Sequence, residues 1–208
     1  MRKYEFAGET ITANGVTLHQ IRALIDIPLH GVRVGDVGGW IEGERNLSHL
    51  GDAWVGDNAR VEGDARVFGN AHIYGYARVN GCAWIRGNAL VFGNAHIYGY
   101  ALVSGHAQIS GYVRVCGDVR VCGNARIDGN ALINSNRDFI SIGPIGSRGD
   151  FITFHKNVNG IICVKCGCFS GTMDEFLTAV QETHGDNEFG QEYRIAAELA
   201  KAHILGED

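Results

Sequence analysis

Proline and long apolar runs are scarce in this sequence of 208 residues. It has two prolines against thirty glycines, and that much glycine without the period of collagen predicts a turn after every short strand. No stretch approaches the ~20 apolar residues that a membrane-spanning helix needs, so we expect no contact with a membrane. The opening MRKYEFAGET has no apolar run behind its basic residues, so we expect no secretory signal and a cytoplasmic location.

A strong excess of charge is also lacking, and cysteine is present without a secretory context. The net charge of −5 argues against a dedicated nucleic-acid-binding protein. Six cysteines without a secretory signal predict free thiols rather than a disulfide framework. Cys163, Cys166 and Cys168 form a C-x-x-C-x-C pattern, with His155 and His184 near in sequence, and zinc binding is one interpretation. Because alternate residues of a strand face opposite sides, structural thiols are favoured, and we predict no metal and no cofactor.

A period of six dominates the middle of the chain. Fourteen consecutive hexads, such as GDARVF, GNAHIY and GYARVN, run from Gly51 to Asn134. The fifth place is always Val or Ile, the third is Ala in all but two hexads, and Gly leads all but one. Six is not a helical period, whereas Ala, x, Val alternates as a strand does and Gly suits the bend. Three hexads close one coil, and stacked coils pair their strands about 4.8 Å apart.

The two ends of the chain lack this period. The sequence predicts an N-terminal cap and first imperfect coil over 1–50, the repeat over 51–134, a connector over 135–146 and a ββαα domain over 147–208. Strands between Tyr4 and Ile27 would form the cap. Both terminal regions would cover open sheet edges that otherwise template aggregation.

Turn and cap signals define the predicted C-terminal domain. Asn159–Gly160 between two β-rich runs predicts a hairpin. Thr172 and Glu175 form a capping box for a helix that stops at Gly185, and GQEYRIAAELAKAHIL follows as a second helix. The apolar face of this second helix is predicted at Ile195, Leu199 and Ala202.

Landmarks before the regular hexads and at their start occur in a fixed order. They are L-x-Q-I-x-A-L from Leu18, G-G-W-I from Gly38, N-L-S from Asn46 and A-W-V-x-D-N-A from Ala53. Over residues 16–134 the chain resembles the YdcK-like hexapeptide-repeat proteins, which are common in phages, prophages and enteric bacteria. The resemblance implies a mainly β fold, a left-handed parallel β-helix. The CGCFSGT, DEF, HGDNE and EY series resembles C-terminal segments of phage-encoded repeat proteins, which would place the protein in the host cytoplasm.

Outward side chains stack at every third hexad, so columns can be read from the sequence. One column holds Arg60, Arg78, His96 and Arg114, with Tyr98 beside it. Stacked like charges repel by tenths of a kcal/mol to about 1 kcal/mol per direct pair. The column therefore predicts a bound anion or an acidic partner, and a solvated face of splayed arginines is the alternative.

Two residues outside the repeat complete the predicted ligand-binding set. Arg148 in SRGD lies where the repeat meets the C-terminal domain, and it could hold an anion or pair with Asp150. His184 stands at a helix end, where it is either a ligand-binding residue or a cap that the helix dipole favours. The predicted ligand-binding residues are Arg60, Arg78, His96, Tyr98, Arg114, Arg148 and His184, with no catalytic residue.

A second column is unusually apolar for an outer wall. It follows Trp54 on the same face and comprises His72 and Leu90, beside Tyr74 and Phe92. Such a surface predicts burial against another subunit, which fits a homotrimer, and a homodimer through the C-terminal domain is the alternative.

One segment, VFGNAHIYGYA, is spelled out twice, at Val67–Ala77 and at Val91–Ala101. A spacing of three hexads would stack its two histidines into one site, but the spacing is four hexads. His72 and His96 are therefore predicted on neighbouring faces, and we interpret the duplication as repeat expansion. The copy with His96 and Tyr98 is favoured for binding because it lies in the arginine column.

These patterns favour a non-catalytic binding protein. The arginine column and the phage-type resemblance suggest sequestration of a phosphate-bearing small molecule of the host, such as a nucleotide immune signal. A hexapeptide acyltransferase acting at subunit interfaces is an alternative, although no inserted loop interrupts the hexads to cover an acyl donor. A structural or assembly protein is another. The histidines lie in different columns, unlike a zinc-dependent γ-type carbonic anhydrase, and residues 51–134 contain no Thr for an ice-binding ladder.

Overall fold

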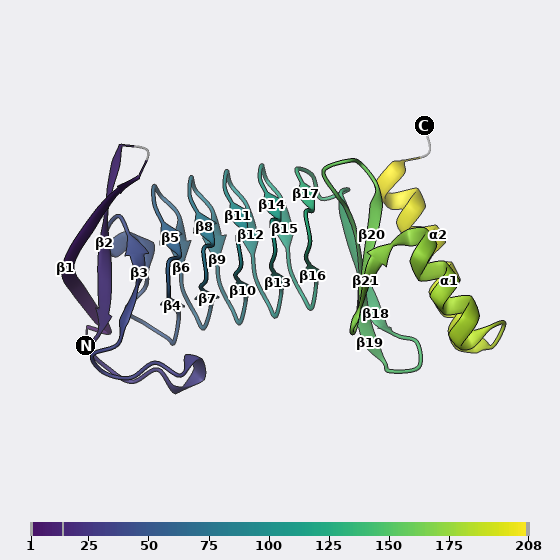
Figure 1. Ribbon diagram of the computed structural model, residues 1–208, viewed down its shortest axis with the longest axis horizontal. Helices are drawn as coiled ribbons and strands as arrows, with labels where there is room; N and C mark the ends of the chain where they lie inside the picture. Colours follow the sequence, from purple (N-terminus) through teal and green to yellow (C-terminus); the bar gives the residue numbers. More distant parts are fainter. Residues whose placement is uncertain (1, 14, 207–208) are drawn as a thin grey trace.

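The computed structural model describes residues 2–13 and 15–206. The fold is mainly β, as predicted: an antiparallel N-terminal cap, a parallel β-solenoid of about five turns, and an antiparallel C-terminal sheet with two helices. These parts follow one another along a single long axis (Figure 1). In the part of the chain that the structure describes, neither helix has the length and apolar character needed to cross a membrane.

The solenoid consists of three parallel sheets made of short strands, one strand per hexad. Each strand pairs with the strand three hexads further on, as the period requires; Arg60 pairs with Arg78, and His96 with Arg114. The strands are β4 (Trp54–Val55), β5 (Arg60–Val61), β6 (Arg66–Val67), β7 (His72–Ile73), β8 (Arg78–Val79), β9 (Trp84–Ile85), β10 (Leu90–Val91), β11 (His96–Ile97), β12 (Leu102–Val103), β13 (Gln108–Ile109), β14 (Arg114–Val115), β15 (Arg120–Val121), β16 (Arg126–Ile127) and β17 (Leu132–Ile133).

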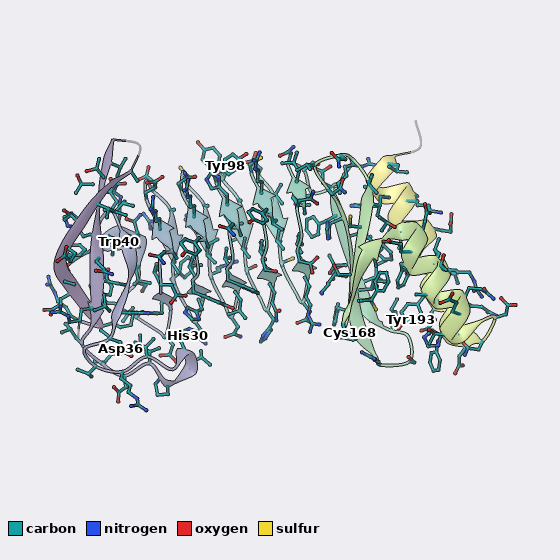
Figure 2. The ribbon with its side chains drawn as sticks, viewed as in Figure 1. His30, Asp36, Trp40, Tyr98, Cys168 and Tyr193 are labelled. Carbon is teal, nitrogen blue, oxygen red and sulfur yellow. The ribbon has the colours of Figure 1, made fainter. Side chains whose placement is uncertain are left out.

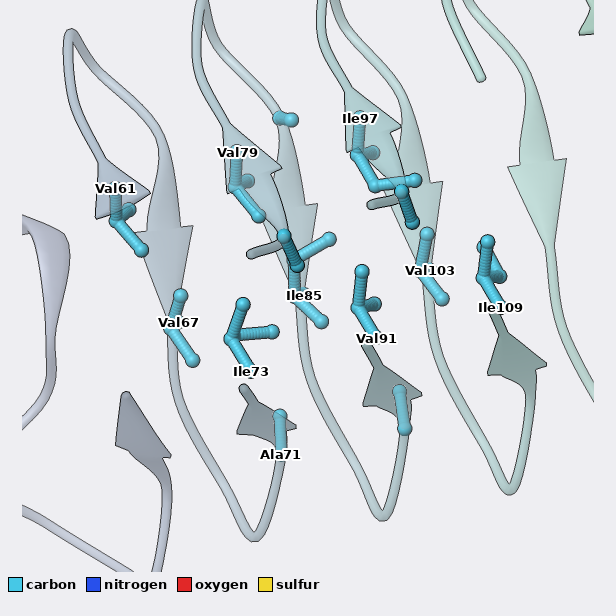
Figure 3. Packing of buried hydrophobic residues seen from close by; sticks show 14 of the residues in the cluster. Val61, Val67, Ala71, Ile73, Val79, Ile85, Val91, Ile97, Val103 and Ile109 are labelled. Carbon is cyan, nitrogen blue, oxygen red and sulfur yellow. The ribbon is translucent and has the colours of Figure 1, made fainter. Parts of the chain in front are cut away.

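Small and branched apolar residues fill the solenoid from end to end. The Val or Ile in the fifth place of each hexad and the Ala or Val in the third place are buried (Figure 3). The Gly that leads a hexad has a second role, which Gly99 illustrates. Its φ of +74° is left-handed, and a Cβ there would lie 2.8 Å from the backbone nitrogen of Gly117 in the next coil. Both the bend and the close approach of coils therefore require Gly.

The N-terminal cap converts an antiparallel sheet into the parallel solenoid. Strands β1 (Tyr4–Ala13) and β2 (Val16–Ala23) form a hairpin, and β3 (Val37–Ile41) pairs antiparallel with β2 and parallel with β5. Trp40 pairs with Arg60, whereas Arg60 pairs with Arg78, so the first coil is slightly longer than the regular ones. Two short 3-10 helices, Pro28–His30 and Glu44–Asn46, lie on either side of β3 in the sequence.

The hydrogen-bond polarity of the solenoid explains which residues cover its N-terminal end. Backbone N–H groups of each coil donate to carbonyls of the next coil, as Arg60 N does to Ala77 O at 2.9 Å. The first coil therefore has carbonyls that need donors. The buried Lys3 ammonium donates to Ala53 O at 2.6 Å, and the Asn46 amide donates to Ala65 O at 2.9 Å. Burial lowers the pKa of Lys3 to about 8.

The C-terminal end has the opposite requirement, because its N–H groups need acceptors. Arg126 N donates to Thr153 Oγ1 at 3.0 Å, and Arg120 N donates to Asn136 Oδ1 at 2.8 Å. Each end of the solenoid is thus closed by side chains of the matching hydrogen-bonding type, which leaves fewer exposed groups for strand addition.

The C-terminal unit contains more strands than the sequence predicts. It has β18 (Phe139–Ile145), β19 (Asp150–Lys156), β20 (Ile162–Cys166) and β21 (Phe169–Thr172), followed by α1 (Met173–His184) and α2 (Glu188–Leu205). The segment 135–146, predicted as a connector, includes β18, so ββαα is wrong and the unit is ββββαα. β18 was missed because its glycine and proline resemble a linker, yet it pairs along β19. The helices cover the sheet face that points away from the solenoid (Figure 1).

The two helices begin as predicted, but α2 packs through a different face. Thr172 N donates to Glu175 Oε2 at 2.7 Å, and Glu175 N donates to Thr172 Oγ1, which confirms the capping box. The apolar face predicted at Ile195, Leu199 and Ala202 does not pack against the sheet, and Ile195 is 69% and Leu199 52% exposed. The buried residues of α2 are Gly190, Tyr193, Ala196, Ala197, Ala200 and Ile204. Alanines allow this helix to lie close to the sheet, and the larger apolar residues are left outside.

Candidate functional site

The arginine column forms one wall of a groove on the solenoid. Parallel pairing places Arg60, Arg78, His96 and Arg114 on consecutive coils, as predicted. The groove has a volume of about 330 Å³. Its lining comprises this column and the corner residues before it: Asn58, Arg60, Tyr76, Arg78, Asn94, His96, Tyr112 and Arg114. Four of the seven predicted ligand-binding residues therefore lie together.

The arginines of the groove carry positive charge that no nearby carboxylate neutralises in a salt bridge. Among the residues that the structure describes, Arg60, Arg78 and Arg114 form no salt bridge. Partial burial lowers the pKa of His96 below its ordinary value, and the charges of Arg78 and Arg114 lower it further. His96 is therefore mostly neutral at neutral pH, and an anion bound beside it would favour its protonated form.

Tyr98 does not line the groove, although it belongs to the predicted set. It lies beyond His96 on the side away from the groove, with the two rings 4.6 Å apart and tilted by 35°. A hydrogen bond with Cys116 and partial burial raise the pKa of its hydroxyl. His96 Nε2 lies 3.4 Å from Asn80 Oδ1, so Tyr98 and Asn80 together hold the imidazole in place.

Arg148 and His184 lie together in a different pocket. This pocket of about 240 Å³ belongs to the C-terminal unit, and Cys166, Cys168 and Tyr193 also line it. Figure 2 shows Tyr98 on the solenoid, well separated from Cys168 and Tyr193. The seven predicted residues thus do not form one site.

The sequence also predicts purely structural roles for Arg148 and His184, as an ion-pair partner of Asp150 and as a helix cap. Asp150 pairs with Arg126 at 3.6 Å, and within the described residues Arg148 forms no salt bridge, so the proposed pairing of Arg148 with Asp150 is wrong. His184 is the last residue of α1, at the helix end that the sequence predicts. Its ring lies against Tyr193, with centroids 5.6 Å apart.

The cysteines of the C-x-x-C-x-C pattern do not converge. In the described ranges, no group of three or more His, Cys, Asp and Glu residues is arranged to hold a metal ion. Cys166 contacts Tyr193 on the helix-covered side of the sheet, whereas Cys163 contacts Asn157 and is influenced by Asp128 of the solenoid. Burial raises the pKa of both thiols, which keeps them protonated at neutral pH.

The apolar column is covered in part by the chain itself. Trp54 is buried beneath Gly38, where an added Cβ would lie 2.6 Å from the Trp54 ring. The His30 ring lies over the His72 ring, with centroids 4.3 Å apart. Residues of β3 thus cover Trp54, and the segment before β3 covers part of His72.

Tyr74 and Phe92, beside the apolar column, remain partly exposed. Tyr74 and Phe92 stack with centroids 4.9 Å apart and planes within 4°. Subunit contact through these two rings in a trimer stays a prediction, as does a dimer through the C-terminal unit.

A charged joint connects the last coil to the C-terminal sheet. Lys165 Nζ lies 3.1 Å from Asp128 Oδ2, and His155 Nε2 lies 3.9 Å from the other carboxylate oxygen. The proximity of His155 and Lys165 lowers the pKa of Asp128 to about 2. Ser170 Oγ also donates to Asp128 at 3.2 Å, so this joint holds the two parts in a defined orientation.

Sequence reasoning missed the corner residues that complete the groove. Asn58, Tyr76, Asn94 and Tyr112 occupy the second place of their hexads, beside the Gly of the bend, and the outward columns read from the sequence do not include this place. Their spacing of three hexads is the signal that would have found them. Comparison of the chain with protein-family models and with curated proteins gives no match.

Proposed function

We propose that this protein is a non-catalytic binding protein that holds a phosphate-bearing small molecule in the groove of the arginine column. The single observation that carries this proposal is the stack of Arg60, Arg78 and Arg114 around His96, with no carboxylate partner for these arginines among the described residues. Guanidinium groups match the geometry of phosphate oxygens and keep their charge at every physiological pH. A bound phosphate would also relieve the repulsion along the column.

The construction of the groove favours holding a ligand over transforming it. The side chains of the column project from strands whose backbone is hydrogen-bonded to the coils on both sides, which makes a rigid surface. Residues 51–134 form coils without an inserted loop that could close over a reacting group. The resemblance to YdcK-like and phage-encoded repeat proteins supports a ligand from the host, and a nucleotide immune signal that is sequestered intact fits this context.

Calorimetric titration of the protein with inorganic pyrophosphate at low ionic strength tests the proposal. Arg78→Ala and Arg114→Ala are each expected to weaken binding at least about tenfold, because a charge-assisted hydrogen bond is lost. Arg86→Ala and Arg120→Ala remove the same charge from the exposed surface of another face and serve as controls. Equal losses in all four variants, or no binding by the unaltered protein, would contradict the proposal.

The same purified protein, loaded with a nucleotide, tests whether binding occurs without catalysis. A nucleotide released from the complex by heating is expected to be chemically unchanged. Stabilisation of the protein by acetyl-CoA in a thermal-shift assay, without any response to pyrophosphate, would favour the acyltransferase alternative. Recovery in purified virions would favour a structural or assembly role.

A further inference from the structure

The corner that borders the arginine column has an alternating pattern of side chains. Asn58, Tyr76, Asn94 and Tyr112 follow one another on consecutive coils, since each is three hexads from the next. The two tyrosines are among the most exposed aromatic residues of the protein, at 63% for Tyr76 and 70% for Tyr112. Two exposed rings therefore stand on the same edge with one short residue between them.

The spacing of the coils determines what fits between these rings. Strands of neighbouring coils lie about 4.8 Å apart, so Tyr76 and Tyr112 are about 9.6 Å apart along the solenoid axis. On the neighbouring face, Tyr74 and Phe92 are one coil apart and stack at 4.9 Å with nearly parallel planes. A flat ring at the level of Asn94 would therefore lie one such step from each tyrosine, which is the separation of stacked aromatic rings.

The position between the tyrosines is open, unlike the corresponding position on a neighbouring corner of the solenoid. At another corner, the Asn70 and Asn88 side chains are 3.0 Å apart in a hydrogen bond, and Asn88 lies 3.4 Å from His106. That column satisfies its own polar groups. Within the described residues, the exposed Asn94 side chain has no hydrogen-bond partner. Its amide, with two donors and one acceptor oxygen, faces the groove.

Positive charge lies directly beside the slot between Tyr76 and Tyr112. Arg78, His96 and Arg114 occupy the same three coils as Tyr76, Asn94 and Tyr112. A ligand that uses both features must combine a flat aromatic ring with an anionic group a few ångströms away. Nucleotides have this combination.

We infer that the groove binds a free nucleotide, with its base stacked between Tyr76 and Tyr112 and its phosphate on Arg78 and Arg114. The Asn94 amide lies at the edge of the base and hydrogen-bonds to it. This inference rests on the proposed function and names its ligand class. A free nucleotide is favoured over a nucleic-acid strand because the groove of about 330 Å³ offers one slot and the chain has a net charge of −5.

Binding of ADP and of pyrophosphate to the same set of variants tests the inference. Tyr76→Ala and Tyr112→Ala are each expected to weaken ADP binding roughly 5- to 100-fold, the range found when a base loses an aromatic stacking partner. Pyrophosphate binding should change less than about twofold, because its contacts are with arginine. Tyr76→Phe should keep most of the ADP affinity. Tyr100→Ala is the matched control, since Tyr100 is 69% exposed on another corner.

A spectroscopic readout separates stacking from other contributions. Base protons of ADP should move upfield on binding to the unaltered protein and to Tyr76→Phe, and less in Tyr76→Ala. Pyrophosphate binding as tight as that of ADP would overturn the inference and leave the proposed function standing. If neither binds, both fail. An equal loss in Tyr100→Ala, or preference for an oligonucleotide over ADP, would also overturn the inference.

Discussion

The two copies of VFGNAHIYGYA are identical in sequence and differ in surroundings. Their inward residues behave alike, and Ile73 and Ile97 are both fully buried. Their outward histidines do not. His72 lies beneath the ring of His30, and burial followed by the charge of His30 lowers its pKa to about 4. His96 lies in an open groove between Arg78 and Arg114.

The difference between the copies separates two kinds of information in a repeat. Inward residues face the same column of Val, Ile and Ala at every step, so a shift of four hexads changes nothing for them. Outward residues depend on what lies one coil before and one coil after, and on whether a cap covers that face. Identical sequence therefore produces identical packing and different chemistry.

Truncation of the inward isoleucines should show the strongest similarity between the copies. Ile73→Ala and Ile97→Ala should each lower the free energy of unfolding by about 2–5 kcal/mol, because each leaves a cavity in a packed core. Denaturant unfolding measures both, and the two values should agree within about 1 kcal/mol. Leu199→Ala on the exposed side of α2 is the control and should cost far less. A large difference between the isoleucine variants would show that the copies are not equivalent inside.

Glycine replacements separate backbone strain from coil stacking. The variant Gly99→Ala should suffer both backbone strain, because φ is +74°, and a clash with the next coil, because the new Cβ would lie 2.8 Å from Gly117 N. Gly123 has a φ of +68°, and an added Cβ would have no neighbouring atom within 4 Å, so Gly123→Ala should suffer backbone strain alone. We expect a loss of about 1–2 kcal/mol for Gly123→Ala and a clearly larger loss for Gly99→Ala. Equal losses by thermal unfolding would show that close stacking adds no requirement for Gly.

Acidification should destabilise the protein through the His72 copy. The folded-state pKa of His72 is about 4 against an ordinary value of 6.5, so below pH 6.5 the unfolded state takes up this proton first. Stability should fall as pH drops from about 6.5 to about 4, by at most about 3 kcal/mol and by roughly 1–2 kcal/mol after allowance for partial exposure.

The variant His72→Gln tests the assignment of this pH dependence. Because His30, His49 and His96 also have lowered pKa values, it should remove part of the loss of stability between pH 6.5 and pH 4, and the part should be larger than for any other single histidine, as measured by urea unfolding across that range. His96→Gln is the matched control in the other copy. If His96→Gln flattened the curve more than His72→Gln did, the burial of His72 would not be the cause.

The smallest effect concerns the titration of His96 upon anion binding. Its pKa is lowered by burial, Arg78 and Arg114, so bound pyrophosphate should raise it by offsetting the two positive charges. Pyrophosphate binding should therefore tighten modestly as the pH falls and His96 becomes protonated. Proton NMR of the two imidazoles measures this directly, with His72 as the internal reference. A shift of the His72 titration as large as that of His96 would contradict a site in the arginine column.

The regular part of the fold could be predicted in detail because a strict period converts sequence distance into spatial neighbours. The stack of Arg60 on Arg78 follows from their separation by three hexads alone, and the register confirms it. The same arithmetic would have shown Tyr76 and Tyr112 on one edge, had turn positions been treated as outward columns. The split of the predicted site could not be foreseen, since Arg148 and His184 lie outside the period.

Local sequence was therefore sufficient for the solenoid, its buried columns, the outward order of its side chains and the capping box at Thr172. Contacts without a period required the folded chain. His30 over His72, Lys3 on the carbonyl of Ala53, and the alanine face of α2 against its sheet each join elements whose relative placement no spacing encodes. The physical reason is that coil stacking is a nearest-neighbour interaction repeated along one axis, whereas caps and joints depend on the shapes of surfaces that meet once.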